Sequence, residues 1–312
     1  MNARPRSVAY AALVLTVAMW ASSAVTARGL LDAIPPVTLA LLRWLVVAAC
    51  LAPFAWRSRR AMLAALRTDF HPYALIALIG FAPQSCLVYF GLAGSTATTL
   101  GIFNSAIPVV IVGILVLFRG RRLDRLEGIG LALSSLGVLL ILARGDLRAL
   151  LSLRFSPYDL MLLASSVFWA IYTIKLTERP AALPLPAFLF MTATLGLAFL
   201  APFATAEIAS KGWPAITSAQ VAGVAYLGTI PTLGASLLFA FAVTRVGALH
   251  AGILTHLMPV FTALFAAVFL GERLHPFHGA GFVLVAGGAL ICCLRAAPVI
   301  TSRPPARAPA RT

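Results

Sequence analysis

The chain repeats itself. Residues 79–139 match residues 230–290, 151 positions later, with 18 identities in 61 ungapped pairs. The match pairs Pro108 with Pro259 and keeps several glycines, but it changes the charges. Arg119, Arg121 and Arg125 of the first copy correspond to Leu270, Glu272 and Pro276 in the second. Connections between membrane helices carry their arginines mainly on the cytoplasmic side. We therefore expect two related units that cross a membrane in opposite directions.

Composition supports a membrane setting. Of the 312 residues, 61% are hydrophobic and 11% are charged, whereas soluble domains carry about 25% charged residues. The net charge of +15 could indicate nucleic-acid binding. However, the arginines lie between apolar segments or in the C-terminal tail, so we expect no nucleic acid partner.

Ten apolar segments are long enough to cross a bilayer, which requires about 20 residues. They lack the period-two alternation of a membrane β-barrel, so the sequence predicts an all-α integral membrane protein with ten transmembrane helices. The segments are Val8–Gly29, Val37–Ala55, Pro72–Gly91, Thr96–Phe118, Glu127–Ala143, Pro157–Lys175, Pro184–Ala206, Ala219–Thr244, Ala248–Leu270 and Pro276–Leu294.

Lysines and arginines in the connections predict the orientation. With the N-terminus in the cytoplasm, 17 of them lie inside and six outside. Both termini are then cytoplasmic. Three of the six outer basic residues, the arginines of Arg144–Arg154, are exceptions to the rule.

Five helices per unit is an odd number, so a second unit in tandem must insert in the opposite sense. We expect two inverted five-helix repeats, 1–143 and 157–295, joined by an outer connection, 144–156. We expect 296–312 to be a disordered cytoplasmic tail, because its run TSRPPARAPART is rich in proline and arginine and has nothing apolar to bury.

Several short motifs resemble the EamA-type units of the drug/metabolite transporter superfamily. They are the run from Pro259 through FLGERL to Gly279 and Gly288, the run Trp20-Ala21-Ser22-Ser23 with its counterpart Trp169-Ala170, and Leu42-Arg43. The resemblance covers about residues 8–295. It implies a secondary transporter in the lipid bilayer, commonly an exporter of small metabolites such as amino acids, with a central cavity between two inverted halves and no cofactor.

One position departs from the family pattern, which often has an acidic residue at the end of both fourth helices. Here Glu272 occupies the second position and Arg121 the first, so the two ends cannot play symmetric roles. Arginine greatly outnumbers lysine, 22 to 2, which is typical of a high-GC bacterial source. We therefore expect the bacterial inner membrane, and we leave a homodimer open.

Arg43 lies about 10 Å into the second predicted helix, at 1.5 Å per residue. A charge at such depth costs about 2.5–3.5 kcal/mol on insertion scales. Arg43 either faces the cavity and attracts an anionic group such as a substrate carboxylate, reaches toward the outer headgroups, or makes a structural hydrogen bond to helix-end carbonyls.

Trp20 and Trp169 lie about 18 Å into their helices, too deep for the interfacial aromatic belt. They are candidates to line a cavity at the repeat interface, and Tyr172 shares the face of Trp169. Packing between helices is the alternative.

Polar residues precede matched prolines in the fourth and ninth predicted helices. Asn104 and His256 are candidate substrate contacts. Asn104 precedes Pro108 by four residues, and His256 precedes Pro259 by three. Such prolines free backbone carbonyls, and matched interruptions in two halves point to a carrier's site. Hydrogen bonds that join helices are the alternative.

Pro83 and Pro231 are further expected helix breaks, with polar neighbours of their own. His256 is also the candidate for proton coupling, because imidazole titrates near neutral pH. For Asp159, which follows Ser156-Pro157, we expect a capping role.

Other patterns indicate structure rather than chemistry. Glu272, His275 and His278 have helical spacing but flank a proline, so we expect no metal site. The four cysteines lie in apolar stretches and favour packing. The paired glycines, Gly128 and Gly130 with Gly279 and Gly281, lack a nucleotide fingerprint and favour close helix packing together with Gly137 and Gly288.

A secondary transporter working by alternating access is the leading functional hypothesis. A nucleotide-sugar or lipid-linked solute carrier is the alternative of the same kind. A membrane-embedded enzyme would need catalytic acids, an activated nucleophile or a metal cluster, and a scaffold would need a soluble partner domain; the sequence supports neither.

Overall fold

The computed structural model describes residues 4–95, 100, 103–146, 156–180, 182–270 and 273–294. The regular elements are α1 (Arg4–Leu31), α2 (Pro36–Arg57), α3 (Arg59–Thr68), α4 (Phe70–Gly80), α5 (Ala82–Gly94), α7 (Ile107–Arg119), α8 (Arg125–Leu142), α9 (Pro157–Thr177), α10 (Leu185–Lys211), α11 (Ser218–Leu227), the π-helix η2 (Gly228–Gly234), α12 (Ala235–Val246), α13 (Ala248–Leu254), the 3₁₀ segment η3 (Thr255–Leu257), α14 (Met258–Leu270) and α15 (Pro276–Leu294).

The prediction of an all-helical membrane protein is confirmed. Within the described ranges, eight helices are long and apolar enough to cross a bilayer, and a shorter apolar one spans Phe103–Arg119. Together with α1 they account for the ten predicted segments. Many large apolar side chains face outward along them, including Leu117 and Phe118, which are both 78% exposed. This exposure suits a lipid surrounding.

The most extensive helix contacts join a helix of the first half to a helix of the second half. They are α8 with α15, α2 with α10, α5 with α9 and α1 with α12. These are the fifth helix with the tenth, the second with the seventh, the third with the sixth and the first with the eighth. Exchanging the two halves leaves the set unchanged, as a two-fold relationship between the repeats requires.

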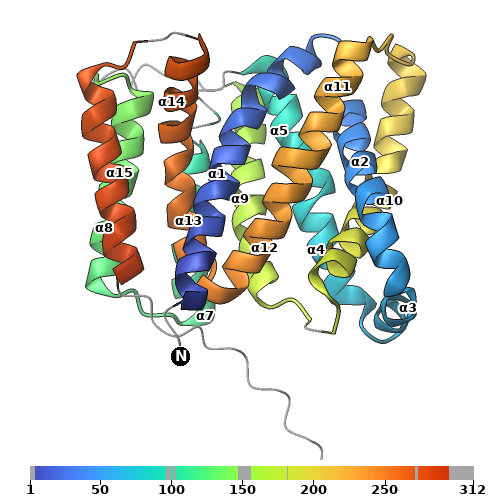
Figure 1. Ribbon diagram of the computed structural model, residues 1–312, viewed down its shortest axis with the longest axis horizontal. Coiled ribbons are helices and arrows are strands. Elements are labelled where there is room, and N and C mark those ends of the chain that lie inside the picture. Colours follow the sequence, from blue (N-terminus) through green and yellow to red (C-terminus); the bar gives the residue numbers. More distant parts are fainter. Residues whose placement is uncertain are drawn as a thin grey trace, which may run out of the picture.

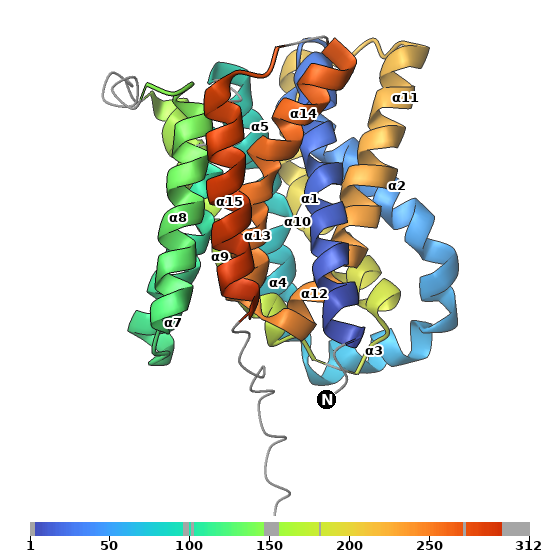
Figure 2. The same cartoon turned by 60° about the vertical axis from the view of Figure 1, so that its left-hand side comes forward.

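The direction of the helices completes the inverted relationship. The N-terminus of α1 and the end of α15 lie at the same end of the bundle, together with the connection from α7 to α8 (Figures 1 and 2). The end of α14 and the start of α15 lie at the opposite end. The two equivalent connections therefore face opposite ends, as the exchange of arginines predicted.

Glycines bring α8 and α15 into backbone contact. A Cβ on Gly137 would lie 2.7 Å from the Gly281 carbonyl oxygen, and one on Gly130 would lie 2.6 Å from that of Gly288. Gly130 is equivalent to Gly281 and Gly137 to Gly288, so the contact is reciprocal. The prediction of close helix packing is confirmed for these four glycines but was wrong for Gly128 and Gly279. A Cβ on Gly128 would make only an ordinary van der Waals contact, and one on Gly279 would meet no atom within 4 Å.

Capping boxes explain where three helices begin. They pair Asp124 with Glu127 at α8, Ser156 with Asp159 at α9, and Thr217 with Gln220 at α11. The capping role predicted for Asp159 is confirmed, and its carboxylate also accepts a hydrogen bond from Ser95.

The helix α3 was not predicted from the sequence. Residues 59–68 were expected to be a plain connection, yet they form a helix across the end of the bundle that holds the N-terminus (Figure 2). Arg59, Arg60 and Arg67 are exposed on it. A basic amphipathic helix in this position resembles those that lie at a membrane surface.

Candidate functional site

A cavity of about 170 Å³ lies between the halves. Five of the predicted substrate-contact residues line it: Trp20, Arg43, Asn104, Trp169 and Tyr172. They come from α1, α2, α9 and the segment before α7. Other lining residues, such as Ala27 and Leu92, lie in the last turns of α1 and α5, so the cavity extends toward the end of the bundle where those helices finish.

Arg43 supplies the charge of the cavity. Its Nη2 donates a hydrogen bond of 2.8 Å to Ser85 Oγ, which also accepts one of 3.1 Å from Trp44 Nε1. The guanidinium lies 5.0 Å from the ring centre of Tyr89 and 5.3 Å from that of Trp44. Its Nε is buried without a hydrogen-bond partner. Among the described residues, no carboxylate forms an ion pair with it.

Aromatic rings form the inner wall of the cavity. Trp20 and Trp169 meet edge to face with ring centres 5.2 Å apart. Phe239, which is 1% exposed, contacts both rings, and Tyr172 lies 5.1 Å from Trp169. The two roles predicted as alternatives, lining the cavity and packing between helices, are therefore both filled by these tryptophans.

Gly80 allows Tyr172 to approach α4. A Cβ at this position would lie 2.2 Å from the Tyr172 ring. Any larger residue at 80 would push the ring toward the cavity, so this glycine sets the position of the wall.

In each of the two matched polar pairs, Asn104-Ser105 and Thr255-His256, the first residue lines the cavity and the second does not. Asn104 and its equivalent Thr255 line the cavity. Ser105 and its equivalent His256 instead contact each other, with His256 Nε2 lying 3.0 Å from the Ser105 carbonyl oxygen. His256 is 1% exposed and is not among the lining residues.

Both ring nitrogens of His256 are engaged. A carbonyl only accepts, so Nε2 carries a proton and donates to Ser105. Nδ1 lies 2.8 Å from Ser134 Oγ, and that hydroxyl lies 3.1 Å from the Leu131 carbonyl oxygen. In neutral His256, Ser134 donates to Nδ1. In protonated His256, Nδ1 donates to Ser134, which then donates to Leu131. Each state of the ring therefore finds hydrogen-bond partners for both of its nitrogens.

The four prolines expected to break helices lie at interruptions. Pro83 follows the break between α4 and α5 at Phe81, and Pro231 lies inside η2. Pro108 begins α7 after a turn at Ala106, and Pro259 begins α14 after η3. Only Pro231 lines the cavity.

The π-helix η2 adds a polar group to the same wall. Thr232 and Ser236, one in η2 and one just after it, line the cavity. Thr232 Oγ1 donates a hydrogen bond to the carbonyl of Leu227, five residues earlier. π-bulges often occur at functional sites.

Glu207 was missed by the sequence analysis. It lies near the end of α10, 8% exposed, and accepts hydrogen bonds from the backbone N–H of Thr38 at 2.8 Å and from its hydroxyl at 2.9 Å. It thereby caps the first turn of α2, whose own N-cap residue is a proline. A carboxylate at a helix N-terminus is favourable, and here it fixes the helix that carries Arg43.

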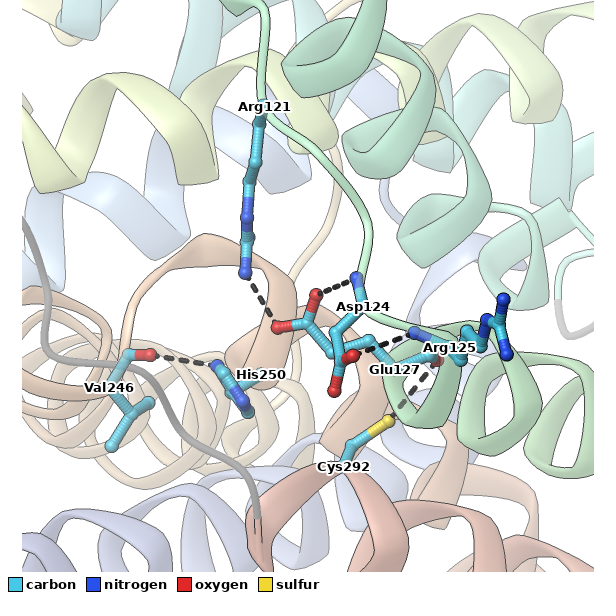
Figure 3. Close-up of polar contacts among 7 residues, drawn as sticks. All are labelled: Arg121, Asp124, Arg125, Glu127, Val246, His250 and Cys292. Carbon is cyan, nitrogen blue, oxygen red and sulfur yellow. Dashed lines mark hydrogen bonds and ion pairs between the residues drawn. The ribbon is translucent and has the colours of Figure 1, made fainter.

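At the end of the bundle away from the cavity opening, polar contacts gather around Glu127. One of them, to Cys292, joins the halves (Figure 3). Arg121 pairs with Glu127 at 2.7 Å, and Glu127 is 3% exposed. Cys292 of α15 donates to the Glu127 carbonyl at 3.5 Å. His250 lies beside them with Nδ1 3.0 Å from the Val246 carbonyl oxygen, and its Nε2 is buried without a partner.

A second contact between the halves lies at this end. Arg119 at the end of α7 forms an ion pair with Glu178, which follows α9 and also pairs with Lys175. Glu272, the residue of the family pattern, and the tail 296–312 lie outside the described residues. Within the described ranges, no group of three or more metal-ligating side chains converges.

Comparisons with known proteins agree with this architecture. The sequence profile of the EamA-like transporter family matches residues 7–143 and again residues 156–294. One solved crystal structure superposes with a TM-score of 0.72 at 20% identity, covering 93% of this chain and 98% of the other. At that identity, the superposition supports the fold alone.

Three relatives that the comparisons found are each 27% identical to the chain. They are an uncharacterized transporter of Archaeoglobus fulgidus (89% of this chain and 95% of the relative), a probable terminal-alkyne amino-acid exporter of Streptantibioticus cattleyicolor (90% and 91%) and a probable amino-acid metabolite efflux pump of Salmonella typhimurium (89% and 92%).

Proposed function

Because the chain belongs to the EamA-like transporter family, we propose that this multi-pass membrane transporter exports a small metabolite, an amino acid or a related compound, by alternating access. The two repeats, 1–143 and 157–295, rock about the cavity between them. As a member of a transporter family, the chain is not an enzyme. The names of the two exporters among its relatives support the choice of solute.

The observation that carries the proposal is Arg43 in a small, largely aromatic cavity. A cation held there without a carboxylate partner provides charge for an anionic group of the solute. A volume of about 170 Å³ is smaller than the roughly 300–1,000 Å³ of sites for drug-sized ligands. It therefore favours a small metabolite over a nucleotide sugar or a lipid-linked solute.

The direction in which the cavity opens indicates the state of the transport cycle. The arginine distribution predicts that the end holding both termini is cytoplasmic. The cavity extends toward the other end, and the contact of Trp20 with Trp169 and the ion pair of Arg119 with Glu178 join the two repeats. We assign this conformation to the outward-facing state of an inner-membrane exporter.

For His256 we propose proton coupling rather than direct contact with the solute. Its ring is engaged by Ser105 and Ser134, so it has no nitrogen to offer the solute. The hydrogen bonds around it serve both protonation states, and its neighbour Thr255 lines the cavity. A proton gained or lost by His256 would therefore act on the cavity through η3.

Metabolite export from cells tests the proposal. Extracellular metabolites are compared, without preselection, between cells that overexpress the wild-type chain, cells that overexpress Arg43→Gln, and cells with an empty vector. We expect a small set of carboxylated metabolites to accumulate outside wild-type cells alone, with equal membrane levels of both proteins. Identical profiles in all three would contradict an export function.

A further inference from the structure

We infer that the cavity selects a small monoanion, a carboxylate on an apolar body without a charged amine, over zwitterionic amino acids and over cations. The inference rests on the proposed function and narrows its solute class. It follows from the charges that line the cavity and from the way the groups around Arg43 are already used.

Among the described residues that line the cavity, Arg43 is the only ionised one. The chain has nine acidic residues, and of those that the structure describes, the two buried ones toward the open end are engaged elsewhere. Glu207 binds Thr38, and Asp159 binds Ser95 and Ser156. A carboxylate beside Arg43 is neutralised by the guanidinium, whereas an ammonium brings a second positive charge without an ionic partner.

The ammonium of an α-amino acid cannot avoid this environment. It is bonded to the carbon next to the carboxylate, so binding of the carboxylate by Arg43 places the ammonium near the same guanidinium. Aromatic faces can hold an ammonium, but the Trp44 and Tyr89 rings nearest to this point already lie under the Arg43 guanidinium. Ser85 Oγ accepts from both Arg43 and Trp44. An uncompensated charge in such a site is costly.

The aromatic inner wall fits an apolar body. Trp20 and Trp169 line this part of the cavity, and both also contact the fully buried Phe239. The rings contact one another, so the wall offers apolar surface and few hydrogen bonds. A solute with its carboxylate at Arg43 and a branched or aromatic group against this wall matches both ends of the cavity.

Four ligands that share one carbon skeleton distinguish selection for a monoanion from selection for a zwitterion or a cation. They are leucine, 4-methylpentanoate (the same body without the amine), N-acetylleucine (the amine made neutral) and 3-methylbutylamine (the amine without the carboxylate). None absorbs or emits where tryptophan does. Three of the five tryptophans, Trp20, Trp44 and Trp169, line the cavity, so intrinsic fluorescence of the purified full-length protein reports binding.

We expect 4-methylpentanoate to bind at least about tenfold tighter than leucine, a ratio that corresponds to about 1.4 kcal/mol. 3-Methylbutylamine should give no saturable change. Arg43→Gln should remove the binding of 4-methylpentanoate. Arg60→Gln is the matched control, because it deletes an exposed arginine of α3 outside the cavity, and it should leave the order of affinities unchanged.

Gln84→Glu provides a gain-of-function test. Gln84 lines the cavity next to Ser85 in sequence, and the substitution nearly preserves its shape while adding the missing negative charge. We expect leucine to bind this variant at least as well as 4-methylpentanoate does. Monodispersity in size-exclusion chromatography and an unfolding temperature close to wild type show that the variant is folded.

Three outcomes would overturn the inference: leucine binding the wild type as tightly as 4-methylpentanoate, 4-methylpentanoate binding Arg43→Gln unchanged, or no binding of any of the four. The metabolite profile judges the proposed function separately. Export of free amino acids, with leucine favoured in the fluorescence titration, would keep the exporter and reject the selection for a monoanion.

Discussion

His256 donates its Nε2 proton to the carbonyl of Ser105, and the two residues occupy equivalent positions in the two repeats, 151 residues apart. Two equivalent residues can touch only near the axis that relates their repeats. Trp20 and Trp169 are also counterparts in the two repeats, and their rings are in contact, so they lie near the same axis. The axis therefore passes by the inner wall of the cavity, where the two repeats meet.

The first prediction concerns His256. His256→Gln keeps a donor for Ser105 and an acceptor for Ser134, so we expect stability and solute exchange without a gradient to persist while the response to a pH gradient is lost. His256→Ala leaves both partners unpaired and should lower stability by about 1–3 kcal/mol. Proteoliposome flux with and without a pH gradient measures the first effect, and unfolding in detergent measures the second. A pH response retained by His256→Gln would exclude the coupling role.

Gly137 provides a test of the contact between α8 and α15. A Cβ there would meet backbone atoms of α15, which cannot move aside without shifting the helix, so Gly137→Ala should destabilise the protein by about 1–3 kcal/mol. Gly128→Ala on the same helix meets only a side-chain atom at 3.5 Å and should leave the unfolding temperature unchanged or slightly raised. Equal effects of the two substitutions would argue against the packed pair.

Glu207 should act on transport through α2. Glu207→Ala removes two hydrogen bonds to Thr38, and we expect a loss of about 1–3 kcal/mol together with a raised apparent KM, because α2 positions Arg43. Glu207→Gln can still accept both hydrogen bonds and should lose less on each measure. If Glu207→Ala unfolded at a lower temperature but kept the wild-type KM, Glu207 would stabilise the protein without affecting the site.

Much of the architecture could be predicted because its causes are local. Apolar runs of membrane length specify helices, arginines between them specify direction, and the equivalence of Pro108 with Pro259 exposes the repeat. Depth along the predicted membrane helices made Trp20 and Arg43 candidates for the cavity. An arginine at that depth needs a polar partner, and a tryptophan pair there lies too deep for the interfacial belt.

The rest depends on contacts between segments far apart in the chain. Glu207 caps α2 across 169 residues, and nothing in its own helix signals this. Helical rotation decides that Asn104 and Thr255 face the cavity while His256 faces Ser134, and rotation cannot be read from spacing alone. The helix α3 escaped notice because ten residues with three arginines form no membrane span.

Labelling of introduced cysteines tests the inverted arrangement in cells. In a background with the four native cysteines replaced, Arg122→Cys and His275→Cys place exposed thiols in the two equivalent connections. An impermeant maleimide should label His275→Cys in intact cells and Arg122→Cys only after permeabilisation. Labelling of both from the same side would contradict the fold as described here.

The most direct test of the central claim is gradient-driven flux. A metabolite identified in the export comparison is loaded, labelled, into proteoliposomes that contain wild-type protein or Arg43→Gln at equal density, and its efflux and chemical identity are followed. Wild-type vesicles should release the unaltered compound at a saturable rate, and Arg43→Gln vesicles should release it no faster than empty vesicles. Equal release from both proteins, or release of an altered compound, would contradict a carrier built around Arg43.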